Sequence, residues 1–563
     1  MLSPLKVDLF KDFNVPFSKS EDKKGVKMSK SILLILPARG LYEIYDEQGI
    51  ALIASYLRLH NYNVIMKTIK DLNDIDLIEL QEISIVGITS YHENLPFVYE
   101  ISQYLKMKKN DIVICLGGYS ATYYAEEILK DCIDVDIIIE REGEQTFLEI
   151  CQKLEKGESL LNQKGIIYRN KEGKIIYTGN QDIISDLSLM PYAAKDIFEE
   201  HNMSLVEIST SRGCLNNCSF CYSHSYFDPR GNVKWRGRTA ENVVEELKII
   251  LSKYKVNKIY FNNASFEDSI PYKGFMLDFC HKIIENKINI SFCVNFRANF
   301  YKHCTEEEIK LLCEAGLTGV FLGIEAFNQY DLKTYNKHTT LEDNLKSIDF
   351  FRKNKIGIDI GFININPYSS YESLKDNAYY LYKTNFLCSL VFLNRLRGYK
   401  DTPIYWRIKQ DGLLKVDNYL DYYCYNFKEK RVGEFTDFMT CIFGEKYKSI
   451  PANMYYFTMY NNQLIAHLNR IYKDNILIKN IIKEYDNERT IILNETNSFC
   501  YTWYKKILEL LRVGWNCDCA KEIIKNDDVC NTMQLIEKEL KIAFFKFTKK
   551  IISVDKNASF YLQ

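Results

Sequence analysis

Short runs of apolar residues alternate with amphipathic helical patterns from about residue 31 to residue 156. The apolar runs are rich in Val and Ile and nearly continuous, which is typical of strands buried on both faces of a parallel sheet. They read SILLILP, YNVIMKT, ISIVGITS, DIVICLGG and DVDIIIE. Between them, QGIALIASYLRLH and PFVYEISQYLKMKK place their apolar residues on one helical face. Five strands with intervening helices predict a doubly wound α/β domain, whose ligands bind beyond the carboxyl ends of the strands.

A second alternation begins near residue 204, after a segment that predicts a hairpin and a linker. The hairpin is GIIYRNKEGKIIY (165–177), which turns at NKEG. The second set of candidate strands reads LVEIST, KIYFNNAS, ISFCVNFR, GVFLGIEA, IDIGFININP and CSLVFLNRL. Helical patterns separate them, and we expect Thr239 to be the N-cap of the first one, RTAENVVEELKIILSKYK. Six βα units predict a parallel barrel or part of one, with its chemistry at the carboxyl ends of the strands.

The patterns at the two ends of the chain complete the predicted organisation. The first 30 residues are polar and lack the apolar core of a signal peptide. After about residue 416, aromatic-rich segments such as NMYYFTMYNNQLIAHLNRIY and MQLIEKELKIAFFKF predict helices. We therefore expect a polar leader over 1–30, an α/β domain over 31–160, a hairpin and linker over 161–203, a barrel over 204–415 and a helical domain over 416–563.

Composition and charge narrow the class of protein. A chain of 563 residues is too long for a single hydrophobic core, and 47% hydrophobic with 26% charged residues is ordinary for globular domains. The net charge of −1 gives no overall field that would attract nucleic acid or anionic lipid, and no apolar run reaches the ~20 residues of a membrane span. We expect a cytoplasmic protein without membrane or nucleic-acid partners. Its 17 cysteines are then thiols or metal ligands rather than disulfides.

Three cysteines differ from the others because they share one loop. The stretch STSRGCLNNCSFCYSHSYF (209–227) places Cys214, Cys218 and Cys221 directly after the first predicted barrel strand. One alternative is a zinc site with His224 as the fourth ligand, because structural zinc normally has four protein ligands. The other is a [4Fe–4S] cluster held by three thiolates, which leaves one iron open to bind and reduce a small molecule. The spacing and the position after the strand favour the cluster.

The motif C-x3-C-x2-C, with Phe220 before the third cysteine, resembles the signature of the radical S-adenosylmethionine (radical SAM) superfamily. Further segments resemble the members that carry an N-terminal cobalamin-binding domain: WRGRTAENVVEEL, LTGVFLGIEAFNQYDLKTYNKHTT, IGFININPYSSYESL and DTPIYWRIKQDGLL. LGGYSAT and EREGEQTFLEI resemble that subfamily's Gly-Gly and Gly-Glu loops. The resemblance covers about residues 31–415. It implies a Rossmann-like cobalamin-binding domain and a partial (β/α)6 TIM-like barrel. The helical C-terminal domain is expected from the residue pattern alone.

The resemblance also implies three cofactors and the residues that bind them. The three cysteines would ligate a [4Fe–4S] cluster, whose open iron would chelate S-adenosylmethionine. One electron would then cleave a carbon–sulfur bond to give methionine and a 5′-deoxyadenosyl radical. The residues implied for S-adenosylmethionine are Phe220, Asn262, Asn263, Arg297, Glu325 and Ile363. Those implied for cobalamin are Ser90, Tyr91, Gly117, Gly118, Glu142, Gly143 and Glu144. Each also has a structural interpretation: Arg297 as an ion pair at the barrel rim, for example, or the two glycines as a simple turn.

The chain departs from the family pattern at several positions. Residues 364–367 read Asn-Ile-Asn-Pro where the family usually has a glycine before the proline, and Ala326 replaces the common serine. The loop LPARGLYEIYDEQG lacks the Asp-x-His-x-x-Gly motif, so we expect no histidine ligand on cobalt. His92 is the histidine nearest to that site in the predicted loops, and we expect it to face solvent. The segment WNCDCAKEIIKNDDVC, with Cys517, Cys519 and Cys530, leaves a second metal site open as an alternative.

The resemblance favours a cobalamin-dependent radical SAM methyltransferase that acts on an unactivated carbon of a natural product or peptide, with flavodoxin or ferredoxin as electron donor. Within the same fold, cobalamin would alternatively support a radical rearrangement or cyclisation without methyl transfer. A further alternative is a radical SAM enzyme whose cobalamin domain is vestigial. The non-enzymatic alternative is a metal-dependent binding protein, which would have four protein ligands per metal and no turnover of S-adenosylmethionine.

Overall fold

The computed structural model describes residues 31–38, 47–227, 233–267, 274–415 and 419–562. The predicted leader over residues 1–30 lies outside this range. The chain divides into two compact units. The first unit comprises Met1–Gly213, Ser223–Arg238 and Asn418–Tyr422. The second comprises Cys214–Tyr222, Thr239–Asp417 and Tyr423–Gln563. The chain therefore changes unit on both sides of the three cysteines.

A seven-stranded sheet in the order β2-β1-β3-β4-β5-β6-β7 forms the centre of the first unit. Its strands are β1 (Ser31–Pro37), β2 (Asn63–Ile69), β3 (Ile83–Thr89), β4 (Val113–Gly117), β5 (Ile137–Ile139), β6 (Ile166–Arg169) and β7 (Ile175–Tyr177). The first five are parallel, as predicted, and β6 and β7 form the predicted hairpin. The hairpin also extends the same sheet, because β6 pairs antiparallel with β5.

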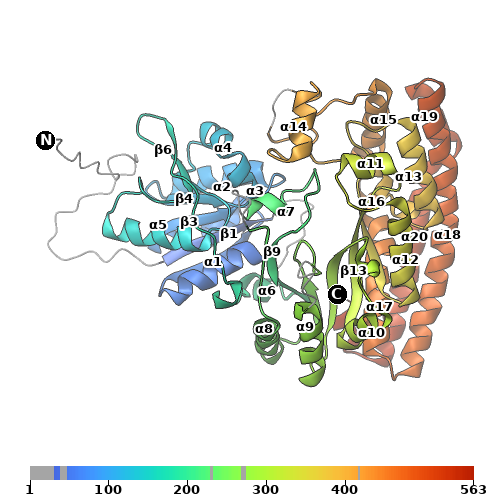
Figure 1. Cartoon of the computed structure of the whole chain (residues 1–563), viewed down its shortest axis with the longest axis horizontal. Helices are drawn as coiled ribbons and strands as arrows, with labels where there is room; N and C mark the ends of the chain where they lie inside the picture. The colour runs from blue at the N-terminus through green and yellow to red at the C-terminus, as the bar shows by residue number, and fades with distance from the viewer. Residues whose placement is uncertain (1–30, 39–46, 228–232, 268–273, 416–418, 563) are drawn as a thin grey trace. The chain divides into compact units, whose positions relative to one another are not determined.

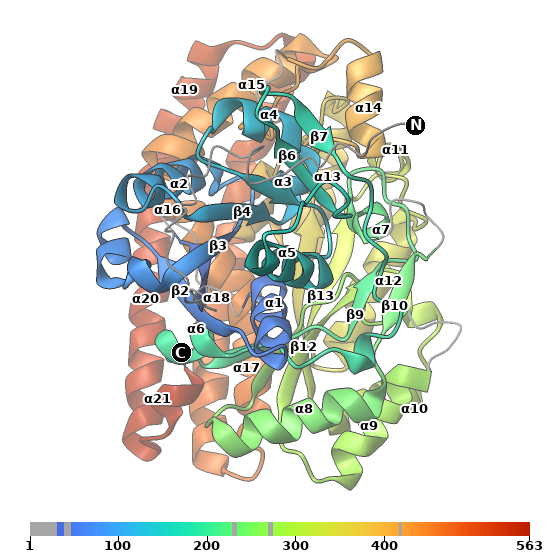
Figure 2. The same cartoon turned by 90° about the vertical axis from the view of Figure 1, so that its left-hand side faces the viewer.

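Helices cover both faces of this sheet, which the alternation of side chains along β1 explains. Leu33 and Ile35 join one buried apolar cluster, whereas Ile32 and Leu34 join the other, because neighbouring side chains of a strand point to opposite faces. The main helices are α1 (Gln48–Leu59), α2 (Leu95–Lys108), α3 (Tyr119–Tyr123), α4 (Ala125–Asp131) and α5 (Glu144–Lys156). Helices α1 and α5 lie side by side on one face (Figure 2). The unit is therefore doubly wound.

Short elements of the first unit precede and follow the cysteine loop in the sequence. They are α6 (Asp196–Glu200), β8 (Leu205–Ile208), β9 (Ser211–Gly213), α7 (Ser223–Tyr226) and β10 (Trp235–Gly237). Strands β9 and β10 pair antiparallel, with Arg212 opposite Arg236. Gly213, the last residue of β9, has a φ of +86°, and a Cβ atom there would lie 2.1 Å from the Lys234 carbonyl oxygen. Only glycine therefore fits directly before Cys214.

Parallel strands alternating with helices make up the first part of the second unit. Strands β11 (Lys258–Phe261), β12 (Ser291–Arg297), β13 (Leu317–Glu325) and β14 (Gly357–Phe362) are neighbours in this order. The helices are α8 (Ala240–Lys253), α9 (Gly274–Glu285), α10 (Glu306–Ala315), α11 (Gln329–Thr334), α12 (Leu341–Lys353) and α13 (Tyr371–Lys383). Thr239 caps α8 as predicted, since its side chain accepts a hydrogen bond from the Asn242 amide. Together with β8, these four strands confirm five of the six strands predicted for the barrel.

The sixth predicted strand, CSLVFLNRL, adopts a different local structure. It forms two 3-10 turns, η6 (Leu387–Ser389) and η7 (Val391–Leu393), joined at Leu390, whose φ is +61°. Within the described ranges, its strand-like pairing consists of one isolated parallel bridge between Ile365 and Arg395. The apolar run correctly predicted burial, because Val391 and Phe392 are buried. Burial alone does not require an extended backbone. Helix α14 (Pro403–Gln410) follows.

The predicted C-terminal helices are confirmed. They are α15 (Lys430–Thr440), η8 (Cys441–Lys446), α16 (Ser449–Tyr455), η9 (Tyr456–Tyr460), α17 (Asn461–Ile471), α18 (Ile476–Val513), α19 (Cys517–Asn526), α20 (Val529–Val554) and α21 (Ala558–Tyr561). Helices α18 and α20 run side by side (Figure 1). α17 packs on β13 and β14, where a Cβ atom on Gly357 would lie 2.6 Å from the Gln463 backbone. Among the helices of the described residues, none is long and apolar enough to cross a membrane.

Candidate active site

The cysteine segment is fixed by hydrogen bonds to two other parts of the second unit. The Ser219 amide donates to the Tyr335 carbonyl oxygen (2.8 Å), and the Ser219 hydroxyl donates to the Thr334 carbonyl oxygen (2.7 Å). The Ser219 carbonyl oxygen accepts from the Ile404 amide at the start of α14 (2.9 Å). Cys218 and Ser219 are buried, whereas Cys214 and Cys221 are half-buried. The loop thus holds its central cysteine inside and the outer two near the surface.

Phe220, predicted to contact S-adenosylmethionine, lies in a small apolar cluster with Ile363. Its ring meets that of Tyr335 edge-on, with 5.6 Å between centroids. Ile363 packs against the same cluster, and its carbonyl oxygen accepts a hydrogen bond from the Tyr335 hydroxyl (2.9 Å). The structure therefore brings together two of the six residues predicted for S-adenosylmethionine through a tyrosine that the sequence did not single out.

The donor set of the cysteine segment fits a cluster better than a single ion. In the described part of the chain, no three Cys, His, Asp or Glu side chains are close enough to hold one metal ion, a group with His224 included. Thiolates on one tetrahedral zinc ion lie about 3.8 Å apart, because Zn–S bonds are ~2.3 Å long. In a [4Fe–4S] cluster each thiolate binds a different iron, so the sulfur atoms stand farther apart. Three thiols spaced along one loop suit that arrangement.

A buried lysine lies beside these thiols. The Lys337 ammonium is 3.4 Å from a carboxylate oxygen of Glu325, and the two side chains are only 6% and 11% exposed. Burial would lower the pKa of Lys337, but Glu325 and the Cys218 and Cys221 thiols outweigh it and raise the pKa. Burial raises the pKa of the Cys218 thiol, and Lys337 acts in the opposite direction. Lys337 thus keeps a positive charge where thiolates would need one.

Glu325 ends β13 with an unusual backbone. Its φ of +62° lies in the left-handed region that L-residues other than Gly, Asn and Asp seldom adopt. The strand register shifts between Gly323 and Glu325 at this point. A Cβ atom on Gly323 would lie 2.9 Å from the Lys337 ammonium nitrogen, so only glycine leaves that space free. Backbone strain of this kind concentrates at ligand sites, which supports the prediction for Glu325.

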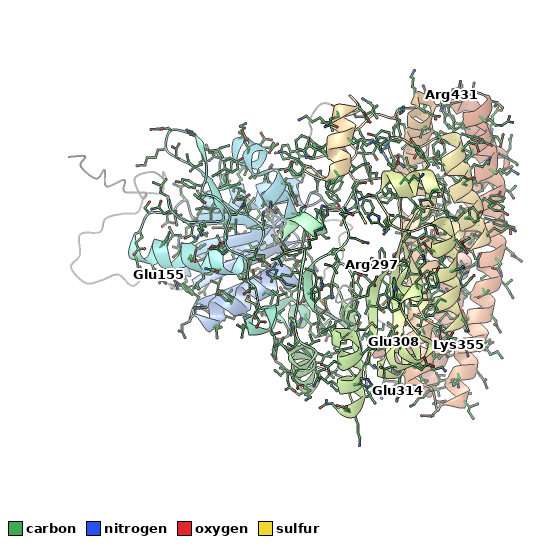
Figure 3. All side chains as sticks on the ribbon, viewed as in Figure 1. Glu155, Arg297, Glu308, Glu314, Lys355 and Arg431 are labelled. Atoms are coloured by element: carbon green, nitrogen blue, oxygen red, sulfur yellow. The ribbon has the colours of Figure 1, made fainter. Side chains whose placement is uncertain are left out.

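The polar residues predicted on the two preceding strands also lie at carboxyl ends. Asn262 and Asn263 directly follow β11, and the Asn263 carbonyl oxygen accepts a hydrogen bond from the Asn295 amide group (2.7 Å). Arg297 ends β12 (Figure 3). Its guanidinium donates to the buried Glu267 carboxylate (2.7 Å). The rim ion pair considered as an alternative role for Arg297 is therefore present, and Glu267, 30 residues upstream, is a partner that no motif indicated.

The departure at Asn364–Pro367 has a structural explanation in a buried amide network. Asn366 donates to the Asp331 carboxylate (2.9 Å) and to the Tyr335 hydroxyl (2.8 Å). Asn364 accepts from Asn377 (3.0 Å) and donates to the Phe392 carbonyl oxygen (2.7 Å). Burial raises the pKa of Asp331, and the hydrogen bonds from its asparagine neighbours oppose that shift. Asn366 thus connects the segment after β14 to α11, and Asn364 connects the same segment to α13.

Three of the residues predicted for cobalamin meet at the ends of β3 and β4 in the first unit. The Ser90 hydroxyl donates to the Gly117 carbonyl oxygen (2.9 Å) and accepts from the Ala121 amide (3.1 Å). Gly118 has a φ of +95°, and a Cβ atom there would lie 2.6 Å from the Ser90 carbonyl oxygen. At Gly117 a Cβ atom would meet nothing within 4 Å. Gly118 thus turns the chain, while Gly117 leaves space for a ligand.

The acidic residues predicted for cobalamin have protein partners. The Glu142 carboxylate pairs with Arg212 (2.6 Å) and Arg236 (2.8 Å), and Glu144 pairs with Arg212. Burial would raise the pKa of Glu142, but the two arginines outweigh it and hold the pKa below its ordinary value. Gly143 between them is buried. Tyr91 lies near Tyr119, with 6.3 Å between ring centroids. Arg212 and Arg236 are partners that the sequence patterns did not indicate.

The expectation that His92 faces solvent is wrong. Its side chain is buried and stacks on Tyr422, with 3.8 Å between centroids, and meets Tyr124 edge-on. Two aromatic neighbours bury the imidazole, and the contacts between the rings compensate for the loss of its contact with water. The C-terminal cysteines are not gathered for a metal: Cys517 and Cys519 are exposed in the first turn of α19, Cys530 is half-buried at the start of α20, and the described residues contain no three-ligand group there.

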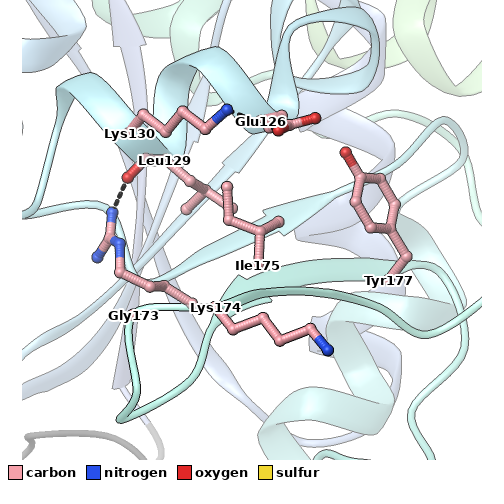
Figure 4. Close-up of a pocket in the computed structure, with 8 residues that line it drawn as sticks. Glu126, Leu129, Lys130, Gly173, Lys174, Ile175 and Tyr177 are labelled. Atoms are coloured by element: carbon pink, nitrogen blue, oxygen red, sulfur yellow. Dashed lines mark hydrogen bonds and ion pairs between the residues drawn. The ribbon is translucent and has the colours of Figure 1, made fainter.

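An open hollow of about 490 Å³ lies elsewhere in the first unit, between α4 and the β6–β7 hairpin (Figure 4). Its rim includes Glu126, Lys130, Lys174 and Tyr177. None of the residues predicted to bind a cofactor lines it. We therefore treat it as surface relief between the hairpin and the helix.

The comparison with protein families decides the classification. Residues 208–376 match the family model of the radical SAM superfamily, and residues 40–151 match that of the B12 binding domain. The chain carries a radical SAM domain and a B12-binding domain. The family predicted from the cysteine loop is thereby confirmed. The cofactors that correspond to these two domains are a [4Fe–4S] cluster, S-adenosylmethionine and cobalamin.

Similar proteins include enzymes with different reactions. An uncharacterized methyltransferase of Pyrococcus horikoshii is 27% identical over 314 residues, which cover 54% of this chain and 66% of that protein. The anaerobic magnesium-protoporphyrin IX monomethyl ester cyclase of Rubrivivax gelatinosus is 28% identical over 332 residues, which cover 56% of this chain and 58% of that protein. The chain thus spans less than two thirds of the length of either relative.

A solved structure supports the fold over nearly the whole chain. It is the cobalamin-dependent S-adenosylmethionine radical enzyme OxsB, determined with aqua-cobalamin and S-adenosylmethionine bound. The TM-score is 0.66 at 16% sequence identity, and the match covers 94% of this chain and 81% of that one. This likeness confirms the predicted fold class, including the helical C-terminal region that the family models do not reach.

Proposed function

We propose that this protein is a cobalamin-dependent radical SAM methyltransferase that acts on an unactivated carbon of a small molecule or peptide. The observation that carries the proposal is the pairing, in one chain, of the cysteine segment beside Lys337 and Glu325 with a B12-binding domain. In this combination methyl transfer is a chemistry that uses both cofactors, and one similar protein is named a methyltransferase.

In this proposal Cys214, Cys218 and Cys221 ligate the cluster. Phe220 and Ile363 provide an apolar surface for the adenine, and Asn262, Asn263, Arg297 and Glu325 bind the polar groups of S-adenosylmethionine. Lys337 offsets the negative charge of the thiolates, and burial strengthens that effect because few water molecules screen it. The wall that Phe220 and Tyr335 form would also keep water from a reactive radical.

In the first unit, Ser90, Tyr91, Gly117, Gly118, Glu142, Gly143 and Glu144 remain the residues that we propose for the cobalamin site. Gly117 offers open space at the end of β4, which suits the approach of a large ring. Ser90 and Gly118 shape the same turn, and Glu142 and Glu144 act through their ion pairs with arginine. When bound, the cluster supplies one electron to S-adenosylmethionine and cobalamin carries the transferred methyl group.

The partners follow from this chemistry. A low-potential electron donor of the flavodoxin or ferredoxin type would reduce the cluster, and we propose a cytoplasmic location, where thiols stay reduced. All seventeen cysteines are free thiols in the structure, in keeping with such a compartment. We propose neither a membrane nor a nucleic-acid partner.

The test is a reaction with S-adenosylmethionine that carries a deuterated methyl group. Protein reconstituted anaerobically with iron, sulfide and cobalamin is incubated with a reductant, and the label is followed by mass spectrometry in the protein-bound corrinoid and in all products. The proposal predicts labelled corrinoid together with S-adenosylhomocysteine. No substrate is needed for this half of the reaction, so the unknown acceptor does not limit the experiment.

A second candidate function is a radical rearrangement or cyclisation, which the similarity to a cyclase favours. It predicts 5′-deoxyadenosine without S-adenosylhomocysteine and without label on the corrinoid. That result would contradict methyl transfer. Failure of the protein to bind cobalamin at micromolar concentration would instead favour a radical domain that works alone.

A further inference from the structure

One loop of the first unit contacts the chain on both sides of the cysteine segment. We name residues 140–146 (EREGEQT), between β5 and the first turn of α5, the anchor loop. Three of its four charged members, Arg141, Glu142 and Glu144, are buried or half-buried and form the contacts described below. Each of them contacts residues between 211 and 236, although the anchor loop and the cysteines are about 70 residues apart in the sequence.

On the upstream side, the anchor loop holds the two-stranded ladder that leads into Cys214. The Arg212 and Arg236 guanidinium groups stand opposite each other across β9 and β10 and would repel one another. The Glu142 carboxylate lies between them and pairs with both, and Glu144 pairs with Arg212. The four side chains are between 4% and 10% exposed. Arg212 is two residues from Cys214, and Gly213 between them packs closely against the Lys234 carbonyl oxygen.

On the downstream side, the anchor loop holds the short helix α7, which begins two residues after Cys221. The Arg141 guanidinium donates to the carbonyl oxygens of Ser225 and Tyr226, both at 2.8 Å. In return the Tyr226 hydroxyl donates to the Arg141 carbonyl oxygen (3.1 Å). A cation at the carboxyl end of a helix satisfies carbonyl groups that the helix leaves open.

This arrangement is costly for a loop whose task is only to hold a fold. Burying charged groups carries a desolvation penalty, and well-packed apolar residues of similar volume often give equal or greater stability. What charged, hydrogen-bonded pairs add is a defined geometry, because each guanidinium fork fits one arrangement of acceptors. The ends of the cysteine segment are the places where such geometry matters, since three thiolates must reach three irons at once.

We propose that the anchor loop is a positioning device for the cysteine segment, with Arg141, Glu142, Glu144 and Arg212 as positioning residues. In this role they act through the two ends of the loop that carries the ligands, not as ligands of the cluster, and Glu142 and Glu144 are also among the residues that we propose for cobalamin. The inference rests on the proposed function, because it assumes that the cysteines bind a cluster. The anchor loop also contains Gly143, which we propose for cobalamin binding, so one loop serves both cofactor sites.

The test compares Arg141→Met and Glu142→Gln with a matched control, Asp136→Asn. The methionine keeps an apolar stem of similar length but lacks the single guanidinium nitrogen, Nη1, that donates to both carbonyl groups of α7. Asp136 forms another buried ion pair of the first unit, with Lys106 at 2.8 Å. The control therefore removes a carboxylate from a comparable pair that does not involve the anchor loop. The reconstituted proteins are mixed with a ferrous-iron chelator, and the rate of iron release is measured.

We expect both anchor-loop variants to release iron about tenfold faster than wild type, the effect typical of residues that orient metal ligands. The control should release iron at the wild-type rate even if its melting temperature falls. Hydrogen exchange of the iron-free proteins provides a second readout, since faster exchange over 211–213 and 223–226 is expected in the variants. This readout does not depend on how much iron a variant binds, so it still tests the proposal if Glu142→Gln takes up little iron.

Wild-type rates of iron release in both anchor-loop variants would overturn the positioning role. So would equally fast release from the Asp136→Asn control, because the effect would then reflect general stability. A wild-type protein that binds no iron would instead overturn the proposed function, and with it the role of the anchor loop. The outcomes are therefore distinguishable.

Discussion

Glu325 illustrates at the scale of single residues what a sequence can indicate and what it cannot. The sequence placed it at the end of a barrel strand and predicted contact with S-adenosylmethionine. The structure adds its left-handed backbone and its buried partner, Lys337. The two residues are 12 positions apart in the sequence, and that spacing alone does not show that their side chains meet. In the same way, Arg297 was expected at the rim, whereas its partner Glu267 follows no motif.

We predict that Glu325→Gln both destabilises the protein and weakens binding of S-adenosylmethionine. Removing one partner of a buried ion pair leaves an uncompensated charge, which costs about 3 kcal/mol of unfolding free energy. Denaturation in urea measures the first effect and calorimetric titration the second. The double variant Glu325→Gln/Lys337→Met should recover most of the stability without recovering the affinity. Full affinity in the double variant would remove both residues from the binding site.

At the scale of elements, periodicity predicted the fold well and failed where an apolar run is not extended. The five strands of the first unit, the hairpin, four of the barrel strands after β8 and the capped α8 all follow from local pattern. The run CSLVFLNRL failed because an apolar run reports burial, and 3-10 turns bury Val391 and Phe392 equally well. The close approach of Gln463 to Gly357 was also out of reach, because more than a hundred residues separate them.

The loop after β4 gives a prediction that separates a structural glycine from a ligand-binding one. Gly118→Ala should lower the unfolding free energy by about 1–3 kcal/mol, because the positive φ and the nearby Ser90 carbonyl oxygen both oppose a side chain. Gly117→Ala should change it by less than about 0.5 kcal/mol, since its Cβ atom would meet nothing.

Cobalamin affinity should respond differently in the same pair. A methyl group at Gly117 would overlap a corrin ring bound there, and such overlap costs about 1–3 kcal/mol of binding free energy. Cobalamin affinity would therefore fall about tenfold or more. Titration of the purified apoprotein with hydroxocobalamin, followed by absorbance, measures it. Unchanged affinity in Gly117→Ala would place the corrin away from the end of β4.

At the scale of the whole molecule, the chain carries a radical SAM domain and a B12-binding domain, and its cysteines, barrel strands and Gly-rich loops made both predictable. The sequence did not predict that the chain passes from the first compact unit to the second at the start of the cysteine segment and returns to the first at its end. Nor did it reveal the ion pairs from Arg212 and Arg236 to Glu142. Such contacts depend on tertiary structure, and residues far apart in a single sequence carry no local signal for them.

The most direct test of the account is the formation of 5′-deoxyadenosine by anaerobically reconstituted protein given S-adenosylmethionine and a reductant. Chromatography with mass detection measures the product, and iron analysis of the same sample gives the cluster content. The account predicts about four irons per chain and steady formation of 5′-deoxyadenosine. In Cys218→Ala both should be lost. Stoichiometric zinc in place of iron, or equal 5′-deoxyadenosine formation by Cys218→Ala, would contradict the assignment of the cysteine segment as the site of radical chemistry.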